Sequence, residues 1–291
     1  MKNGIVGAAS AMFLVGTLAG VSGLVDGYPL YGGQAVRYLV AAVVLLLITR
    51  ALGLRFVRMT ARETLCLGGL TLLGLVLFNV CVIESTRDSG PTLVGTVLGT
   101  VPLALALAGG RPRPRLLVAA GVVVAGATLA TGLGSGTATG LLWALGALVG
   151  EVAFSLLAIP LLPKLGAIRV SAYSTTLAVP MLALIGLADA GTGMLRVPTT
   201  AEALGFAYMA LVITVGAFFL WYTSLPKLGP GRAGLFAGLI PVGAIVTGTV
   251  LGVAMPTTYD LVGAGLVIMG ILLGLTAERS GARAAVSPSE A

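Results

Sequence analysis

The chain has 291 residues, of which 57% are hydrophobic and only 9% are charged. Soluble domains carry about 25% charged residues, so this composition excludes a water-soluble domain and indicates a protein of the lipid bilayer. The net charge of +7 reflects basic residues in short gaps between apolar runs, which indicates membrane orientation and argues against nucleic-acid binding. Histidine is absent, so histidine-based metal sites and Ser–His or Cys–His nucleophile pairs are excluded, and we expect no metal or cofactor.

Ten segments are long and apolar enough to form membrane-spanning helices, each of which needs about 20 mainly apolar residues. In chain order they are 4–24, 31–49, 64–83, 90–109, 116–131, 140–162, 170–188, 203–223, 231–253 and 261–276. The first lacks an Ala-x-Ala cleavage site, so we expect it to be retained as a helix. The predicted fold is therefore an all-α integral membrane protein.

The charges between these segments alternate in sign from one side to the other. One side collects Lys2, Arg50, Arg55, Arg58, Arg62, Arg111, Arg113, Arg115, Lys164, Arg169, Lys227, Arg232, Arg279 and Arg283. The other side holds Arg87, Arg196, Asp26, Glu84, Asp88, Asp189, Glu202 and Asp260. Because cytoplasmic loops are rich in Lys and Arg, this pattern predicts a cell-membrane protein with both termini in the cytoplasm.

The segment 85–102 recurs, without a gap, as the segment 224–241 at an offset of 139 positions. The matching pairs are Ser85 and Ser224, Gly90 and Gly229, Pro91 and Pro230, Gly95 and Gly234, Gly99 and Gly238, and Pro102 and Pro241. Five helices per half would turn the second half upside down, and inverted repeats around a central cavity are typical of secondary transporters. We therefore predict a first repeat at 1–136, an inverted repeat at 137–277 and a cytoplasmic tail at 278–291.

Several local motifs resemble the EamA-like type of the drug/metabolite transporter superfamily. They are Ala217-Phe-Phe-Leu-Trp-Tyr222, Leu228-Gly229, Arg232-Ala233 and Pro241-Val242, which are similar to the family's eighth and ninth helices, and Arg37-Tyr-Leu-Val-Ala-Ala42, similar to the start of its second helix. The resemblance covers residues 4–276. It implies a carrier that moves small metabolites, often outward, through a cavity lined mainly by helices 1, 3, 4, 6, 8 and 9.

Glu151 is the main candidate for chemistry. It lies 11 residues into the sixth span, roughly 16 Å along a helix and so near the middle of the bilayer. A carboxylate at this depth is costly unless it is neutral, paired or hydrated, so it should face the interior. It is either a proton-accepting or cation-binding group of the transport site, or a protonated acid that bonds one helix to another.

Arg37, near the outer end of the second span, has three interpretations. It could be the counter-ion of Glu151, or its side chain could extend outward toward Glu84 or Asp88. Its place in a general family motif favours a structural role.

Three residues of the third and eighth spans are further candidates for substrate binding. The offset of 139 relates Asn79 to Phe218 and Ile83 to Tyr222, and each helix carries its two positions on one face. Asn79 either hydrogen-bonds a substrate or makes a contact between helices. Trp221 and Tyr222 could stack on a substrate, although for Trp221 we favour a place in the interfacial aromatic belt.

The fourth and ninth spans share a Gly-xxx-Gly pair followed by a proline. Gly95 and Gly99 precede Pro102, as Gly234 and Gly238 precede Pro241. Small residues permit close helix packing, and proline removes a backbone hydrogen bond and permits a bend. Either tight packing or a gating hinge accounts for this pattern.

The sequence thus predicts a secondary transporter, a permease or exporter, and not an enzyme. It would move an amino acid or an amphipathic or cationic compound across the cell membrane by alternating access, with protons as candidate coupling ions. An efflux carrier for drugs and toxic compounds is the alternative. An intramembrane enzyme is a third possibility, since Gly20-Val-Ser-Gly23 spells a rhomboid-protease motif, but no histidine is present to activate the serine. The expected partners are a small-molecule substrate, protons and membrane lipids, and not nucleic acid.

Overall fold

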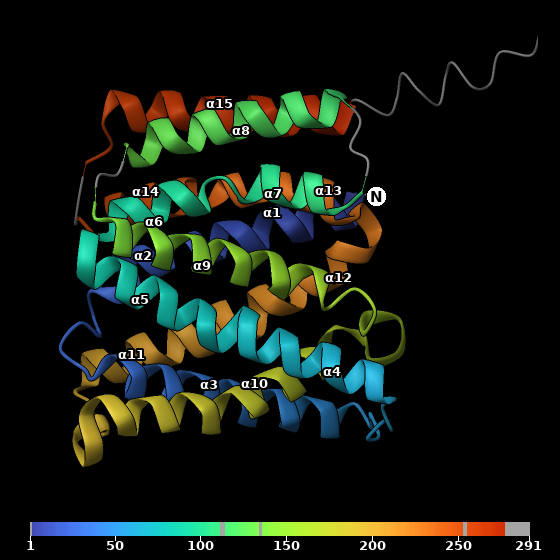
Figure 1. Ribbon diagram of the computed structural model, residues 1–291, viewed down its shortest axis with the longest axis vertical. Coiled ribbons are helices and arrows are strands. Elements are labelled where there is room, and N and C mark those ends of the chain that lie inside the picture. Colours follow the sequence, from blue (N-terminus) through green and yellow to red (C-terminus); the bar gives the residue numbers. More distant parts are fainter. Residues whose placement is uncertain (1, 111–113, 134–135, 253–254, 277–291) are drawn as a thin grey trace, which may run out of the picture.

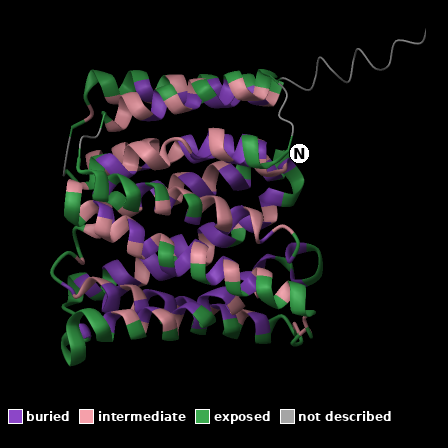
Figure 2. Ribbon diagram, viewed as in Figure 1, coloured by how far each residue is buried: buried purple, intermediate pink, exposed green. Residues whose placement is uncertain are grey.

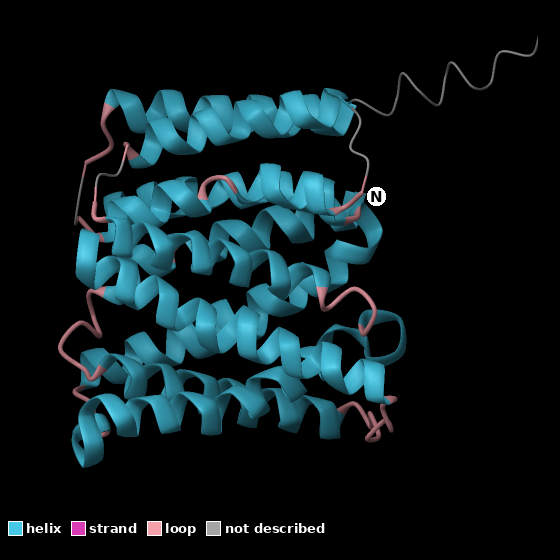
Figure 3. Ribbon diagram, in the orientation of Figure 1, coloured by secondary structure: helices cyan, strands magenta, loops and turns pink. Residues whose placement is uncertain are grey.

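The computed structural model describes residues 2–110, 114–133, 136–252 and 255–276. Within these ranges the chain contains helices and loops but no strand (Figure 3). Ten of the helical stretches are long and apolar enough to cross a membrane. The predicted all-α fold with ten spans is therefore confirmed. The predicted tail at 278–291, together with Arg111, Arg113, Arg279 and Arg283, lies outside the described residues.

The first five spans consist of eight α-helices and one π-helical segment, η1. They are α1 (Lys2–Gly16) with α2 (Leu18–Ser22); α3 (Leu30–Ala51); α4 (Ala61–Gly69), η1 (Leu70–Leu77) and α5 (Phe78–Ser89); α6 (Pro91–Leu98) with α7 (Val101–Ala108); and α8 (Pro114–Thr131).

The last five spans follow the same plan. They are α9 (Ala138–Leu156); α10 (Leu162–Ala190) with the 3-10 turn η2 (Gly191–Met194); α11 (Thr200–Tyr208), the π-helical η3 (Met209–Ala217) and α12 (Phe218–Leu228); α13 (Pro230–Leu235), the 3-10 turn η4 (Phe236–Gly238) and α14 (Leu239–Val250); and α15 (Thr258–Thr276).

The spans run back and forth along one direction, so the connections lie at two ends of the molecule (Figure 1). The N-terminus, the α3–α4 connection and the α12–α13 connection lie at one end, and the α5–α6 connection lies at the other. The described basic residues of the predicted cytoplasmic set belong to the end where the chain begins. This arrangement follows the charge alternation of the sequence.

Local structure recurs at the offset of the sequence repeat. The third and eighth spans, Ala61–Ser89 and Thr200–Leu228, each contain a π-helical segment. The segment begins at Leu70 in the third span and at Met209 in the eighth. Gly90 and Gly229 both have positive φ, 79° and 74°, a conformation that favours glycine. Each is followed by a proline at the first helical position, where the missing N–H is not needed.

The starts of these two spans are also capped alike. Thr60 and Thr199 each accept a hydrogen bond from the backbone of the residue three positions on, and Glu63 and Glu202 bond back to the two threonines. Such reciprocal bonds satisfy backbone donors that a helix start leaves open.

Small residues set the distances between neighbouring helices. Gly126 of α8 and Gly263 of α15 face each other so closely that a Cβ on Gly263 would lie 2.6 Å from the Gly126 carbonyl oxygen. Gly16 and Gly243 bring α1 and α14 equally close. Close backbone approach is the main packing device of membrane helices. Buried residues fill the middle of the bundle, whereas exposed ones gather at the helix ends and on the outermost helices (Figure 2).

Candidate functional site

A cluster of aromatic rings forms where α9 meets α12. The Phe154 ring centroid lies 4.8 Å from that of Phe218 and 4.9 Å from that of Tyr222. Phe218 and Tyr222 lie one turn apart on α12, and their ring centroids are 6.1 Å from each other. Gly74 of η1 permits α9 to come near, because a Cβ there would lie 2.8 Å from the Phe154 Cα. The structure thus brings the two predicted α12 residues onto one face together with a phenylalanine that sequence reasoning missed.

Glu151 lies three residues before Phe154, on the same face of α9. Along α9, Glu151 lies thirteen residues after the first residue, Ala138, and five before the last, Leu156. These separations correspond to about 20 Å and 8 Å along the helix axis. It is therefore closer to the end of α9 that lies on the side of the N-terminus. Its side chain is partly exposed and forms no hydrogen bond or ion pair with the described residues.

The Tyr222 hydroxyl belongs to the ring that lies against Phe154. It is buried and has no hydrogen-bond partner among the residues described, and the same is true of the Ser155 hydroxyl, one turn after Glu151. A buried polar group without a partner is costly. Two unused hydroxyl groups therefore lie on the helices that carry the carboxylate and the rings.

Asn79 is buried on α5 and joins the same region to α3. Its side-chain nitrogen donates to the Tyr38 hydroxyl at 3.1 Å and to the Leu75 carbonyl at 2.6 Å. Asn79 therefore makes a contact between α5 and α3 through Tyr38.

Arg37 points to a different neighbour from those expected. Its Nε donates to the Thr214 hydroxyl of η3 at 2.9 Å, its Nη1 donates to Gln34 at 3.4 Å, and its guanidinium lies 5.4 Å from the Tyr38 ring centroid. It forms no ion pair with Glu151 or with any other described acid. Arg37 thus ties α3 of the first half to η3 of the second.

The two acids that were considered as outer partners of Arg37 are engaged elsewhere. Glu84 accepts hydrogen bonds from the Tyr31 hydroxyl and, at 2.9 Å, from Arg87. Asp88 accepts hydrogen bonds from its neighbour Ser89 and from Thr137, the residue before α9. Neither carboxylate is available to Arg37.

Trp221 is only 2% exposed. The expectation that it belongs to an interfacial belt is therefore wrong. The adjacent helices cover the whole indole, and its ring nitrogen has no partner within the described part of the chain. Its apolar sequence surroundings gave no sign of this burial.

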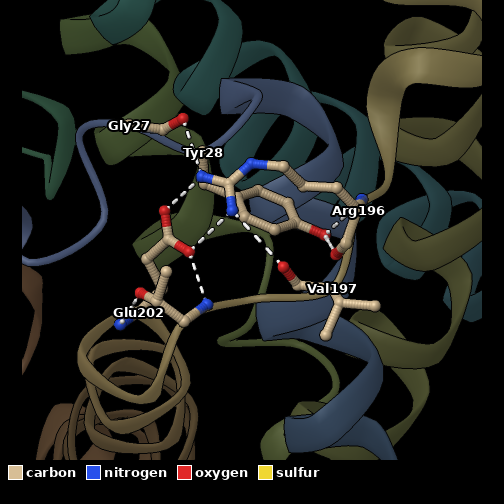
Figure 4. A network of polar contacts seen from close by, with 6 residues as sticks. Gly27, Tyr28, Arg196, Val197 and Glu202 are labelled. Carbon is tan, nitrogen blue, oxygen red and sulfur yellow. Dashed lines mark hydrogen bonds and ion pairs between the residues drawn. The ribbon is translucent and has the colours of Figure 1, made fainter.

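A second polar network joins the connection before α3 to the connection before α11 (Figure 4). The Arg196 guanidinium donates to Glu202 and, at 2.9 Å, to the Gly27 carbonyl, and lies 4.9 Å from the Tyr28 ring centroid. The Tyr28 hydroxyl donates to the Arg196 carbonyl at 2.8 Å. The hydrogen bond to Glu202 raises the pKa of Arg196 above its ordinary value. This network fastens the α2–α3 connection to the start of α11.

The repeat-related glycines differ in their surroundings. A Cβ on Gly234 would lie 2.8 Å from the Leu105 Cβ, and Gly238 is packed against Val123 and Val267. A Cβ on Gly95 would meet nothing within 4 Å. Both spans are interrupted near these glycines, before Pro102 and Pro241, by the α6–α7 break and by η4. Tight packing therefore explains Gly234 and Gly238 but does not explain Gly95.

Ten apolar spans that enclose a buried cluster of polar and aromatic groups define a multi-pass membrane protein. Residues 138–276 match the model of the EamA-like transporter family. The expected resemblance is confirmed, and the chain is a membrane transporter of small molecules with an EamA-like transporter domain in its second half.

Two individual proteins extend the comparison over nearly the whole chain. The uncharacterized transporter YetK of Bacillus subtilis (strain 168) is 27% identical over 284 residues, which cover 92% of this chain and 85% of YetK. A solved crystal structure of a protein with 18% sequence identity superposes with a TM-score of 0.81, over 95% of this chain and 98% of that one. At this identity the second comparison shows the fold alone.

Proposed function

We propose that the protein is a secondary transporter of the cell membrane that moves a small amphipathic metabolite and exchanges it for a proton at Glu151. It works by alternating access between two inverted repeats, at 1–136 and 137–277, with both termini in the cytoplasm. Because the sequence carries no ATP-binding motif, any uphill transport would draw on an ion or solute gradient.

The local structure that recurs at the 139-residue offset supports the inverted repeats. The turns at Gly90 and Gly229 have the same backbone geometry but lie at opposite ends of the bundle (Figure 1). Related halves of opposite direction are the usual basis of alternating access, because each half can adopt the other's conformation in turn.

The unpaired carboxylate of Glu151 carries the proposal of proton coupling. An acid inside a membrane span is stable when it is protonated or paired with a cation. Glu151 has no such partner among the described residues, and its side chain is partly exposed. A carboxylate of this kind can release its proton as substrate binds and recover it after substrate leaves.

Transport into proteoliposomes across an imposed pH gradient tests the coupling. We expect Glu151→Gln to abolish the flux that the gradient drives, for a panel of small metabolites, while the protein stays folded. Glu63→Gln is the matched control, because Glu63 is a surface carboxylate that pairs with Lys164 at 2.7 Å. Undiminished gradient-driven flux in Glu151→Gln refutes coupling at this residue. Recovery of a chemically altered compound would indicate an enzyme instead.

Cysteine labelling tests the inverted arrangement. In a background without Cys66 and Cys81, we expect cysteines at Asp88 and Lys227, both exposed positions, to react with an impermeant maleimide from opposite sides of the membrane. Labelling of both from the same side contradicts inverted repeats.

A further inference from the structure

The surroundings of Glu151 supply no positive charge. Of the elements that pack against α9, η1, α6 and α7 contain no ionisable side chain. Helix α5 contributes Cys81 at the level of Gly146, and its other ionisable residues, Glu84, Arg87 and Asp88, lie at its C-terminal end, beside the start of α9 and far from Glu151. From α12 the contacting ionisable group is Tyr222, whose ring centroid lies 4.9 Å from that of Phe154. The described chain therefore leaves Glu151 without a counter-ion, and a bound cation would supply one.

The groups beside the carboxylate suit an ammonium ion with an attached flat apolar group. The ring centroids of Phe154, Phe218 and Tyr222 lie 4.8 to 6.1 Å from one another, and aromatic rings attract cations and stack on flat apolar groups. The unpartnered hydroxyl groups of Ser155 and Tyr222 can accept N–H donors. Each part of an arylalkylammonium ion thus finds a matching group within two helices.

The same cluster disfavours a substrate that carries a carboxylate. Arg37 is the one arginine buried within the described part of the chain, but its Nε is bonded to Thr214 and its Nη1 to Gln34. A carboxylate beside Phe154 would therefore meet Glu151 and not a cation. Like charges at short range in a low dielectric are strongly unfavourable.

We propose that Glu151, Phe154, Ser155, Phe218 and Tyr222 form a binding site for organic ammonium ions without a carboxylate, such as arylalkylamines, and that such amines are the class of compound the protein carries. This inference rests on the proposed transport function and narrows it from small amphipathic metabolites to amines. The amine and the proton compete for one carboxylate, so binding of one displaces the other.

Equilibrium dialysis of the purified protein with radiolabelled phenylethylamine, near neutral pH, tests the site. Phenylalanine, phenylpropionate and phenylethanol serve as competitors, since they share the ring and differ in charge. We expect unlabelled phenylethylamine to compete at least about ten-fold more strongly than the other three, because a hydrogen bond to a charged group contributes about 1.5–3 kcal/mol. Acidification should weaken amine binding. Equal competition by phenylpropionate overturns the proposal.

Variants assign the binding to individual groups. We expect Glu151→Gln to lower the affinity for phenylethylamine about ten-fold or more, and Phe154→Leu to lower it several-fold by removing a ring face. Glu63→Gln should bind like the wild type. If Glu151→Gln does not give a monodisperse protein, Glu151→Asp and Phe154→Leu replace it. Wild-type affinity in folded Glu151 and Phe154 variants refutes the site.

The binding assay separates this inference from the proposed function. Amine binding that depends on Glu151 but is accompanied by no flux driven by a pH gradient would overturn proton coupling and leave the binding site intact. Gradient-driven flux of some other compound, without amine binding, would overturn the amine site and leave the coupling intact.

Discussion

Gly95 and Gly234 occupy equivalent positions of the sequence repeat, yet alanine at the two positions should have opposite effects. Both lie in right-handed helical backbone, in α6 and α13, so alanine is conformationally allowed at each. At Gly95 a Cβ has open space. Alanine in a helix interior is favoured over glycine by about 0.5–1 kcal/mol, so Gly95→Ala should be neutral or slightly stabilising.

At Gly234 the added Cβ would lie 2.8 Å from the Leu105 Cβ and 3.1 Å from its Cδ1. Carbon atoms that are not bonded prefer about 3.5–4.0 Å. A Cβ is fixed to the backbone and cannot rotate away, so α13 and α7 would have to separate by almost 1 Å. Overpacking of this kind costs about 1–3 kcal/mol. Gly234→Ala should therefore destabilise the protein by that amount.

Unfolding titrations of the purified variants in mixed micelles measure both effects. Gly238→Ala supplies a further test, because the atom nearest its added Cβ is the Val123 Cγ1, the end of a side chain. Val123→Ala removes that atom, so the double variant should regain part of the stability that Gly238→Ala loses. Equal stability of Gly95→Ala and Gly234→Ala would refute the reasoning, as would a double variant that is no more stable than Gly238→Ala.

Three further predictions concern the other buried and surface contacts. Thr214→Val should lower the free energy of unfolding by about 1–3 kcal/mol, because it leaves the buried Nε–H donor of Arg37 without a partner. An unchanged unfolding titration would show that this hydrogen bond does not stabilise the protein. Arg196→Gln should accelerate hydrogen exchange in residues 23–29 with little effect on global stability, since the ion pair is partly exposed. Unchanged exchange there would show that the network does not hold this connection. In a variant where Trp221 is the only tryptophan, neither acrylamide nor a quencher at the lipid headgroups should reduce its fluorescence strongly, whereas an interfacial indole would respond to both.

The number of spans and the alternation of the loops could be predicted because each depends on local composition. Apolar length decides what crosses a bilayer, and basic residues decide which loops share a side. The pairing of Phe218 with Tyr222 on one face also follows from spacing along a single helix. Phe154 and Ser155, one turn from Glu151, could have been found from the same spacing.

What the sequence did not reveal depends on contacts between distant segments. Arg37 meets Thr214, 177 positions away, and no periodicity connects them. Trp221 is buried because adjacent helices cover it, although its position near a helix end favoured an interfacial belt. Likewise, Gly95 and Gly234 are equivalent in the repeat, and only their neighbours decide which of them is packed.

The 139-residue offset also extends to α1 and α9, and it shows where the two halves differ. Gly7 approaches the Leu220 carbonyl and Gly146 approaches Cys81, and these two contacts are related by the same offset. By this relation the counterpart of Glu151 is Met12, a buried residue of α1. Asn79 and Phe218 are likewise unlike residues at equivalent positions. The backbone can therefore be nearly symmetrical while the carboxylate is present on one side only. Like charges repel in a low dielectric, so under the proposed function a single acid per protein is the arrangement that lets one cation or proton neutralise the site.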